Sequence, residues 1–350
     1  MSTASHRSPQ GPGTPGEPGS SSEAAGARAP AGRPPLDPGL VIGPVDSRGQ
    51  LAAARRLLGP GRGDGQAAQR MLDSALLHGI DLGHMWCSAK RGAQGAAAGP
   101  RQVCLIVRGA GGSAMTFTST PANAGEEKEL AAVIEAAFAA LRGTALGQAL
   151  LEVHEQAAQR ALLSAGFRGV GTLTYLRRPT PRLGSMPPVR DWPEGVRVRR
   201  YAAHDDAELI AGLERTYIDT LDCPELCGLR ETKDVLESHR ATGRFDPNMW
   251  WLVESKGRVE GALLFNSCAD QDSVELVYLG LSPALRGMGL GSLLVHHGLA
   301  VLAGRNESWI SCAVDERNTP ARRVYARAGF DAFGRRAAFV KPLRTSAAPE

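Results

Sequence analysis

The sequence lacks the features that would assign it to several common classes. No run approaches the roughly 18 consecutive apolar residues of a membrane span, and the amino terminus has no apolar core of a secretory signal. Aromatic residues make up only 5% of the chain, and 40 basic against 36 acidic side chains leave a net charge of +4 without a basic footprint for nucleic acid. We therefore expect a cytoplasmic protein that binds neither membranes nor nucleic acids.

Cysteine is also scarce. The chain has six, with no Cys-x-x-Cys pair and no histidine at zinc-finger spacing. Reduced thiols are more typical of this pattern than disulfides or metal ligands, so we expect no metal site.

Glycine and proline, in contrast, are abundant, with 42 and 23 among 350 residues. Residues 1–39 hold 8 Pro, 7 Gly and 6 Ser and no apolar run, which predicts a disordered tail. A second proline-rich stretch predicts a linker over residues 181–195, since proline interrupts helices and central strands. The length fits two domains, which we place at 40–180 and 196–345.

The two predicted domains end alike. Residues 156–167 and 319–330 align at an offset of 163, and the same offset superposes Pro179 on Pro342. Each segment has a helical pattern that glycine stops before an apolar, strand-like stretch. The shared offset indicates an internal duplication.

The second half shows the clearer alternation of elements. A strand at 196–199 precedes helical patterns at 205–221 and 234–241, and the apolar run 274–281 is typical of a central strand. This order predicts an α/β protein of the α+β type. We expect two tandem domains, each a mixed central sheet with helices on both faces.

A glycine-rich loop, Arg286-Gly-Met-Gly-Leu-Gly291, stands between the apolar run and a helix that begins near Ser292. Glycine permits positive φ and close backbone approach, so N–H groups at a helix start can hold a pyrophosphate. The alternative is a turn that needs glycine only for its geometry. The spacing is neither the Rossmann fingerprint nor the P-loop.

This loop, after Leu281-Ser-Pro283, resembles the pyrophosphate loop of the GNAT superfamily of acyl-CoA-dependent N-acyltransferases. Asn318, Ala321, Tyr325 and Gly329-Phe330 resemble the second motif of that superfamily, and the likeness covers residues 196–345. It implies a transferase that moves an acetyl or other acyl group from acetyl-CoA to a small-molecule or protein amine. A non-catalytic acyl-CoA-binding or regulatory protein on the same fold is the alternative.

The resemblance also implies roles for individual residues. Tyr325 would protonate the departing thiolate, unless it is a core aromatic residue. Glu275 would deprotonate the amine, unless it is a strand-end carboxylate in solvent; it shares a face with Val277 and Leu279 only if the strand has no bulge. Asn318 would face the acyl-CoA or cap its helix. The implied cofactor contacts are Leu279, Gly280, Leu281, Arg286, Gly287, Met288, Gly289, Leu290, Gly291, Ser292, Asn318 and Arg322.

Acceptor binding is the least specified property. Residues 205–237 hold ten acidic side chains against three basic ones, which favours a cationic acceptor or a solvated helix face. The irregular stretch 220–230 lies where the resemblance places the acceptor, so Asp222 and Glu225 are candidate contacts.

The first half resembles the same fold without its chemistry. The offset of 163 aligns Leu162 with Tyr325 and Glu155 with Asn318, and residues 125–129 contain three glutamates where the glycine loop would be. Carboxylates there would repel a pyrophosphate. We expect residues 40–180 to support the second half or shape its acceptor site.

Overall fold

The computed structural model describes residues 37–59, 64–91 and 99–343. The predicted tail lies almost wholly outside these residues. All of the described residues belong to one compact unit. None of the described helices is long and apolar enough to cross a bilayer.

Among the described residues, the α-helices and strands of the amino-terminal half follow the order βααβββαβαβ. They are β1 (Leu40–Pro44), α1 (Gln50–Leu58), α2 (Gly65–Leu77), β2 (Met85–Lys90), β3 (Val103–Arg108), β4 (Ser113–Thr118), α3 (Ala124–Ala140), β5 (Leu146–Glu152), α4 (Gln156–Ser164) and β6 (Arg168–Pro179).

The carboxy-terminal half has the same order of elements. They are β7 (Val196–Arg200), α5 (Asp206–Tyr217), α6 (Thr232–Ala241), β8 (Trp250–Ser255), β9 (Arg258–Cys268), β10 (Ser273–Leu281), α7 (Leu290–Leu302), β11 (Trp309–Asp315), α8 (Thr319–Arg327) and β12 (Asp331–Pro342). The offset of 163 carries β5, α4 and β6 onto β11, α8 and β12 without a residue of difference, which confirms the duplication. Residues 180–195 contain neither helix nor strand.

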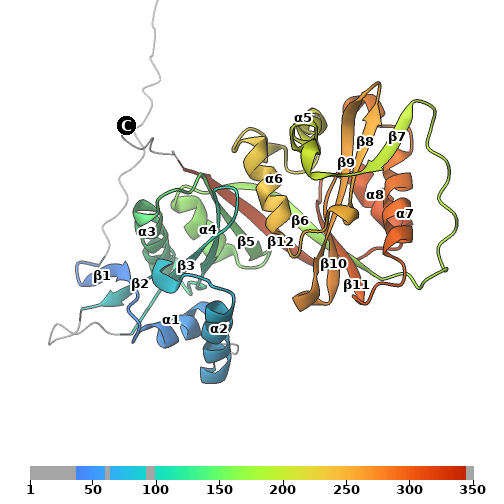
Figure 1. Cartoon of the computed structure of the whole chain (residues 1–350). Helices are drawn as coiled ribbons and strands as arrows, with labels where there is room; N and C mark the ends of the chain where they lie inside the picture. The colour runs from blue at the N-terminus through green and yellow to red at the C-terminus, as the bar shows by residue number, and fades with distance from the viewer. Residues whose placement is uncertain (1–36, 60–63, 92–98, 344–350) are drawn as a thin grey trace, which may run out of the picture. The chain divides into compact units, whose positions relative to one another are not determined.

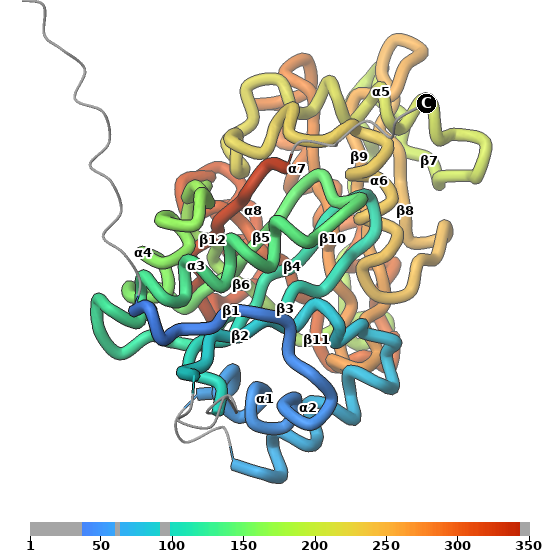
Figure 2. The backbone as a smooth tube through the Cα atoms, turned by 90° about the vertical axis from the view of Figure 1, so that its left-hand side faces the viewer, coloured from blue at the N-terminus to red at the C-terminus, as the bar shows by residue number. Residues whose placement is uncertain are grey.

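The twelve strands form one mixed sheet, in the order β1-β2-β3-β4-β5-β12-β6-β11-β10-β9-β8-β7 (Figure 1). The last strands of the two halves are exchanged: β12 pairs with β5, and β6 pairs with β11. In Figure 2 the red β12 accordingly runs beside the green β5. The mixed sheet is confirmed, but it is continuous through both halves, because β6 and β12 also pair with each other.

Helices cover both faces of the sheet in each half, as predicted. In the amino-terminal half, α3 and α4 pack on one face and α1 and α2 on the other. In the carboxy-terminal half, α7 and α8 pack on one face and α5 and α6 on the other. The exchange also reaches the cores, since Phe339 of β12 is buried among α3 and α4 of the first half.

Candidate active site

The strands β10 and β11 separate in the middle of the sheet. They are parallel neighbours only from Ser273–Trp309 to Glu275–Ser311, whereas β10 stays paired with β9 as far as Leu281. Among the described residues, the Leu279–Leu281 backbone therefore has a strand partner on one side only. An extended ligand can pair with the other side like an added strand, which is the place that the resemblance implies for pantetheine.

A cavity of about 1070 Å³ opens at this separation. It is lined by ten of the twelve predicted cofactor residues and by Tyr325. The two exceptions are Met288, whose side chain is 48% exposed, and Arg322, which donates to the Glu316 carbonyl. The ten are Leu279, Gly280, Leu281, Arg286, Gly287, Gly289, Leu290, Gly291, Ser292 and Asn318.

The glycine loop has the geometry of an anion cradle. Gly287 and Gly289 have φ of +78° and +77°, and a Cβ added to either would meet no atom within 4 Å. Gly289 precedes the first residue of α7, so the positive end of this helix lies at the loop. These residues fit a pyrophosphate.

Arg286 holds the loop in place through its side chain. Its guanidinium donates to the carbonyls of Leu281 (2.9 Å), Thr216 (2.9 Å) and Asp219 (3.1 Å). These three hydrogen bonds all go to backbone carbonyls, and they join the loop to β10 and to the end of α5.

Tyr325 and Asn318 have the packing and capping roles that the sequence allowed, and both also line the cavity. Tyr325 is 6% exposed and packs against Phe330, yet it lines the cavity. Burial raises the pKa of its phenol well above 10, so at neutral pH it is a protonated hydroxyl. Asn318 accepts a hydrogen bond from the Ala321 N–H (3.2 Å) as the helix cap and also lines the cavity.

Glu275 is not among the residues that line the cavity. The register of β10 shifts between Leu276 and Tyr278, so the unbulged alternation that would place Glu275 with Val277 and Leu279 is wrong. The carboxylate instead lies 3.9 Å from the Cys268 thiol, and burial raises its pKa.

The two predicted acceptor contacts lie in different surroundings. Asp222 lines the cavity, whereas Glu225 does not and is paired with Arg317 through two bonds of 2.6 and 2.8 Å. That hydrogen-bonded pair lowers the pKa of Glu225. Most other carboxylates of the acidic stretch also have basic partners, as a structural surface would; these are Asp205, Asp206, Glu208, Glu231 and Glu237.

The individual residues that the first half adds to the cavity were not predicted from the sequence. Leu146 and Gln148 of β5 and Leu173 of β6 line it beside the residues of the second half. The strand exchange brings them there, because β6 lies directly next to β11. An aromatic group that includes Tyr217 and Tyr278 forms another part of the wall, with ring centroids 6.4 Å apart.

The segment of the first half that is equivalent to the glycine loop holds three glutamates, which form hydrogen bonds and ion pairs with neighbouring side chains. Glu126 accepts from Gln102 (2.9 Å), Glu127 pairs with Arg160 (2.6 Å), and Glu129 pairs with Arg101 (3.0 Å). These carboxylates belong to the first turns of α3, so no glycine cradle exists at this position.

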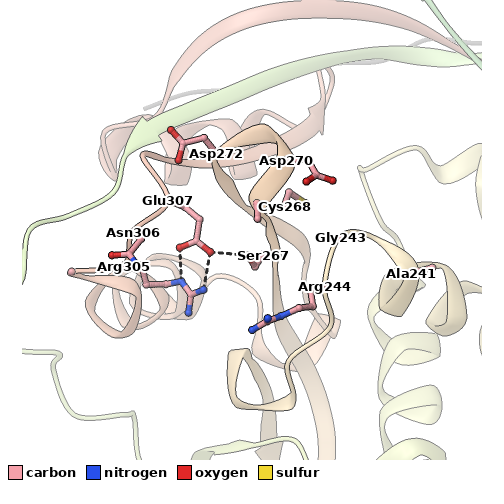
Figure 3. Close-up of a pocket in the computed structure, with 12 residues that line it drawn as sticks. Ala241, Gly243, Arg244, Ser267, Cys268, Asp270, Asp272, Arg305, Asn306 and Glu307 are labelled. Carbon is pink, nitrogen blue, oxygen red and sulfur yellow. Dashed lines mark hydrogen bonds and ion pairs between the residues drawn. The ribbon is translucent and has the colours of Figure 1, made fainter. Parts of the chain in front are cut away.

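A second cavity, of about 920 Å³, lies where β9 ends, beside the turn that follows α6 and the one that follows α7 (Figure 3). In its wall, Glu307 accepts from Arg305 (2.8 Å) and from the Ser267 hydroxyl (2.7 Å). Cys268 also lines it, so Glu275 contacts a residue of this second cavity. Among the described residues, no group of three or more His, Cys, Asp or Glu could hold a metal ion.

Comparisons with known proteins agree with this geometry. Residues 213–330 match the model of the acetyltransferase (GNAT) family. A mycothiol acetyltransferase of Thermobispora bispora is 32% identical over 188 residues, which cover 51% of this chain and 61% of the relative. One of Thermomonospora curvata is 32% identical over 195 residues, covering 55% and 63%. The chain thus spans less than two thirds of the length of these relatives.

Solved structures show the same fold. A GCN5-related N-acetyltransferase of Sphaerobacter thermophilus superposes with a TM-score of 0.57 at 20% identity, covering 88% of this chain and 97% of that chain. Its likeness extends over both halves, so the fold of the whole described unit has a solved counterpart. Residues 213–330, which hold the glycine loop and the separated strands, are thus similar to the acetyltransferase (GNAT) family.

Proposed function

We propose that the protein is an acetyl-CoA-dependent N-acetyltransferase that acts on a small-molecule amine. One observation carries the proposal: the open side of β10, the glycine cradle and the Tyr325 phenol all line the same cavity. A thioester that pairs with Leu279–Leu281 and places its pyrophosphate at Gly287–Ser292 would lie along this wall. The relatives named mycothiol acetyltransferases support the acetyl group as the cargo and a mycothiol-related amine as one acceptor to test.

In this proposal, backbone groups of the cavity bind the cofactor and one side chain transfers a proton. Backbone N–H groups of the cradle would bind the pyrophosphate, and the Leu279–Leu281 backbone would orient the pantetheine arm. Acetyl-CoA supplies the activated acetyl group. Tyr325 would donate its proton to the departing sulfur, a role that suits a neutral phenol. A regulatory protein that only binds acyl-CoA would have no use for this donor.

A cytoplasmic location of the protein stays a prediction.

Gly291→Glu tests the cofactor site with little risk to the fold. Gly291 has no left-handed backbone, and an added Cβ would lie 3.8 Å from Val324, at ordinary van der Waals distance. The glutamate would fill the cradle and oppose the charge of the ligand, so we expect calorimetry to detect no acetyl-CoA binding. Gly291→Ala is the matched control and should keep measurable affinity.

The activity itself is tested by the release of CoA thiol from acetyl-CoA in the presence of a library of amines. Turnover with at least one amine is the expected result. Undiminished acetyl-CoA affinity in Gly291→Glu, or binding without turnover for every amine, would contradict the proposal.

A further inference from the structure

The loop that carries Asp222 has a backbone that its surroundings must hold in place. It connects α5 to α6, and two of its residues, Asp219 and Cys223, have φ of +51° and +47°. Left-handed φ is unfavourable for residues other than glycine and persists only where neighbouring contacts fix it. Such backbone often occurs at functional sites.

Reciprocal hydrogen bonds attach this loop to the end of β11. Asp222 Oδ1 accepts from the Asp315 N–H (2.7 Å), and Asp315 Oδ2 accepts from the Cys223 N–H (3.1 Å). Arg317 secures the arrangement, because it pairs with the fully buried Asp315 and donates to the Val170 carbonyl of β6. The position of Asp222 therefore depends on both halves of the chain.

The attachment uses only one oxygen of the Asp222 carboxylate. Its Oδ2 has no hydrogen-bond partner among the described residues, and the side chain lines the cavity that Tyr325 also lines. The carboxylate is close enough to Tyr325 and Tyr278 for its charge to contribute to the raised pKa of both phenols. The Asp222 carboxylate thus lines the same space as the Tyr325 phenol.

The other candidate carboxylates are placed less well to take a proton from an acceptor bound in the cavity. Glu225 is occupied by Arg317, and Glu275 does not line the cavity. Glu214 and Asp219 do line it and are exposed, as Asp222 is, but neither carboxylate has a fixed partner among the described residues. A base must be held within reach of the proton that it removes. Among the described carboxylates that line the cavity, only Asp222 combines a fixed oxygen with a free one.

We propose that Asp222 binds the ammonium group of the amine acceptor and acts as the catalytic base of acetyl transfer. The inference rests on the proposed function and adds to it a cationic amine as the acceptor class. Asp222 takes one proton from the ammonium group and later releases it to solvent. The neutral nitrogen then bonds to the thioester carbonyl carbon as the carbon–sulfur bond breaks. The sulfur leaves with the electron pair and takes the Tyr325 proton, and the second nitrogen proton restores Tyr325.

The environment of Asp222 predicts the pH range of this step. Although Asp222 is exposed, desolvation of its carboxylate by the surrounding protein is the main cause that raises its pKa, and the charge of Asp315 adds to it. The Asp315 N–H and Arg317 act in the opposite direction. The base is active only when ionised, so kcat/KM should fall as the pH falls through a pKa above the usual aspartate range. The titratable and charged groups around Asp222 are Cys223, Tyr278, Cys312, Asp315, Arg317 and Tyr325.

Asp222→Asn and Glu275→Gln, compared in the full-length protein, test the proposal. The asparagine carbonyl can still accept from the Asp315 N–H, so thermal unfolding and acetyl-CoA affinity should match the wild type. We expect kcat/KM for the best amine of the library to fall about 10²- to 10⁴-fold in Asp222→Asn, with loss of the acidic limb of its pH profile. Glu275→Gln should keep that limb.

The outcomes separate this inference from the proposed function. A wild-type protein that acetylates no amine would overturn both. An active wild type together with an Asp222→Asn variant of near-normal rate, or with equal losses in the two variants, would overturn only the role of Asp222. Loss of the acidic limb in Glu275→Gln alone would give the role of base to Glu275.

Discussion

Replacing Phe339 by alanine tests the strand exchange, because this residue belongs to the second half in sequence but to the core of the first half in space. Phe339 is 6% exposed and packs in the cluster that α3 and α4 form with β3, β4 and β5. Truncation of a buried phenylalanine to alanine costs about 3–5 kcal/mol of unfolding free energy, since the cavity left behind is only partly refilled. Here its ring packs over Gly169, which has no side chain to move into the space.

Phe333→Ala is the matched control on the same strand. Phe333 is 51% exposed, and its contacts are the Tyr175 ring and the Arg177 guanidinium. We expect its loss to cost less than about 1.5 kcal/mol, because a surface aromatic pair or cation–π contact contributes roughly 0.5–1.5 kcal/mol. Urea unfolding of both variants, followed by circular dichroism, gives the comparison.

The helices that are destabilised by Phe339→Ala distinguish the exchanged arrangement of strands from two independent domains. In Phe339→Ala, hydrogen exchange of the α3 amides should accelerate by about 10²- to 10³-fold, as a loss of 3–4 kcal/mol implies at 1.4 kcal/mol per decade. Unchanged protection of α3 together with faster exchange in α7 and α8 would refute the reasoning, because it would place β12 in the core of its own half.

Two further comparisons use equivalent or neighbouring positions. Tyr325→Phe should lower kcat about 10²- to 10⁴-fold with acetyl-CoA affinity nearly intact, whereas Leu162→Ala, at the equivalent fully buried position, should cost about 2–5 kcal/mol of stability and leave the specific activity of folded enzyme unchanged. Steady-state kinetics and denaturation decide, and full activity of Tyr325→Phe would remove its assigned role. Gly111→Ala should destabilise the protein far more than Gly112→Ala in thermal unfolding. Both glycines have φ near +62°, but a Cβ at Gly111 would lie 1.8 Å from the Asp234 carbonyl oxygen, whereas one at Gly112 has ordinary contacts. Equal melting temperatures would show that α6 does not dock on this turn.

The sequence by itself determined the repeat and the glycine loop. Alternation, helix periodicity and glycine stops are local, so the elements that follow the glycine loop could be matched at one offset, and β5, α4 and β6 correspond to β11, α8 and β12 as expected. The glycine loop could also be predicted from the sequence, because positive φ at Gly287 and Gly289 is a local requirement that favours glycine.

The tertiary structure alone decided which strands pair and which carboxylate reaches the cavity. Since β6 and β12 are repeats of one another, their patterns are interchangeable, and no local signal shows that each lies beside the other half. The bulge that moves Glu275 depends on the register with β9, and the attachment of Asp222 depends on Asp315, 93 residues further along the chain. Such pairings are set by packing between distant segments, where the free energy of burial and backbone hydrogen bonding outweighs what neighbouring residues prefer.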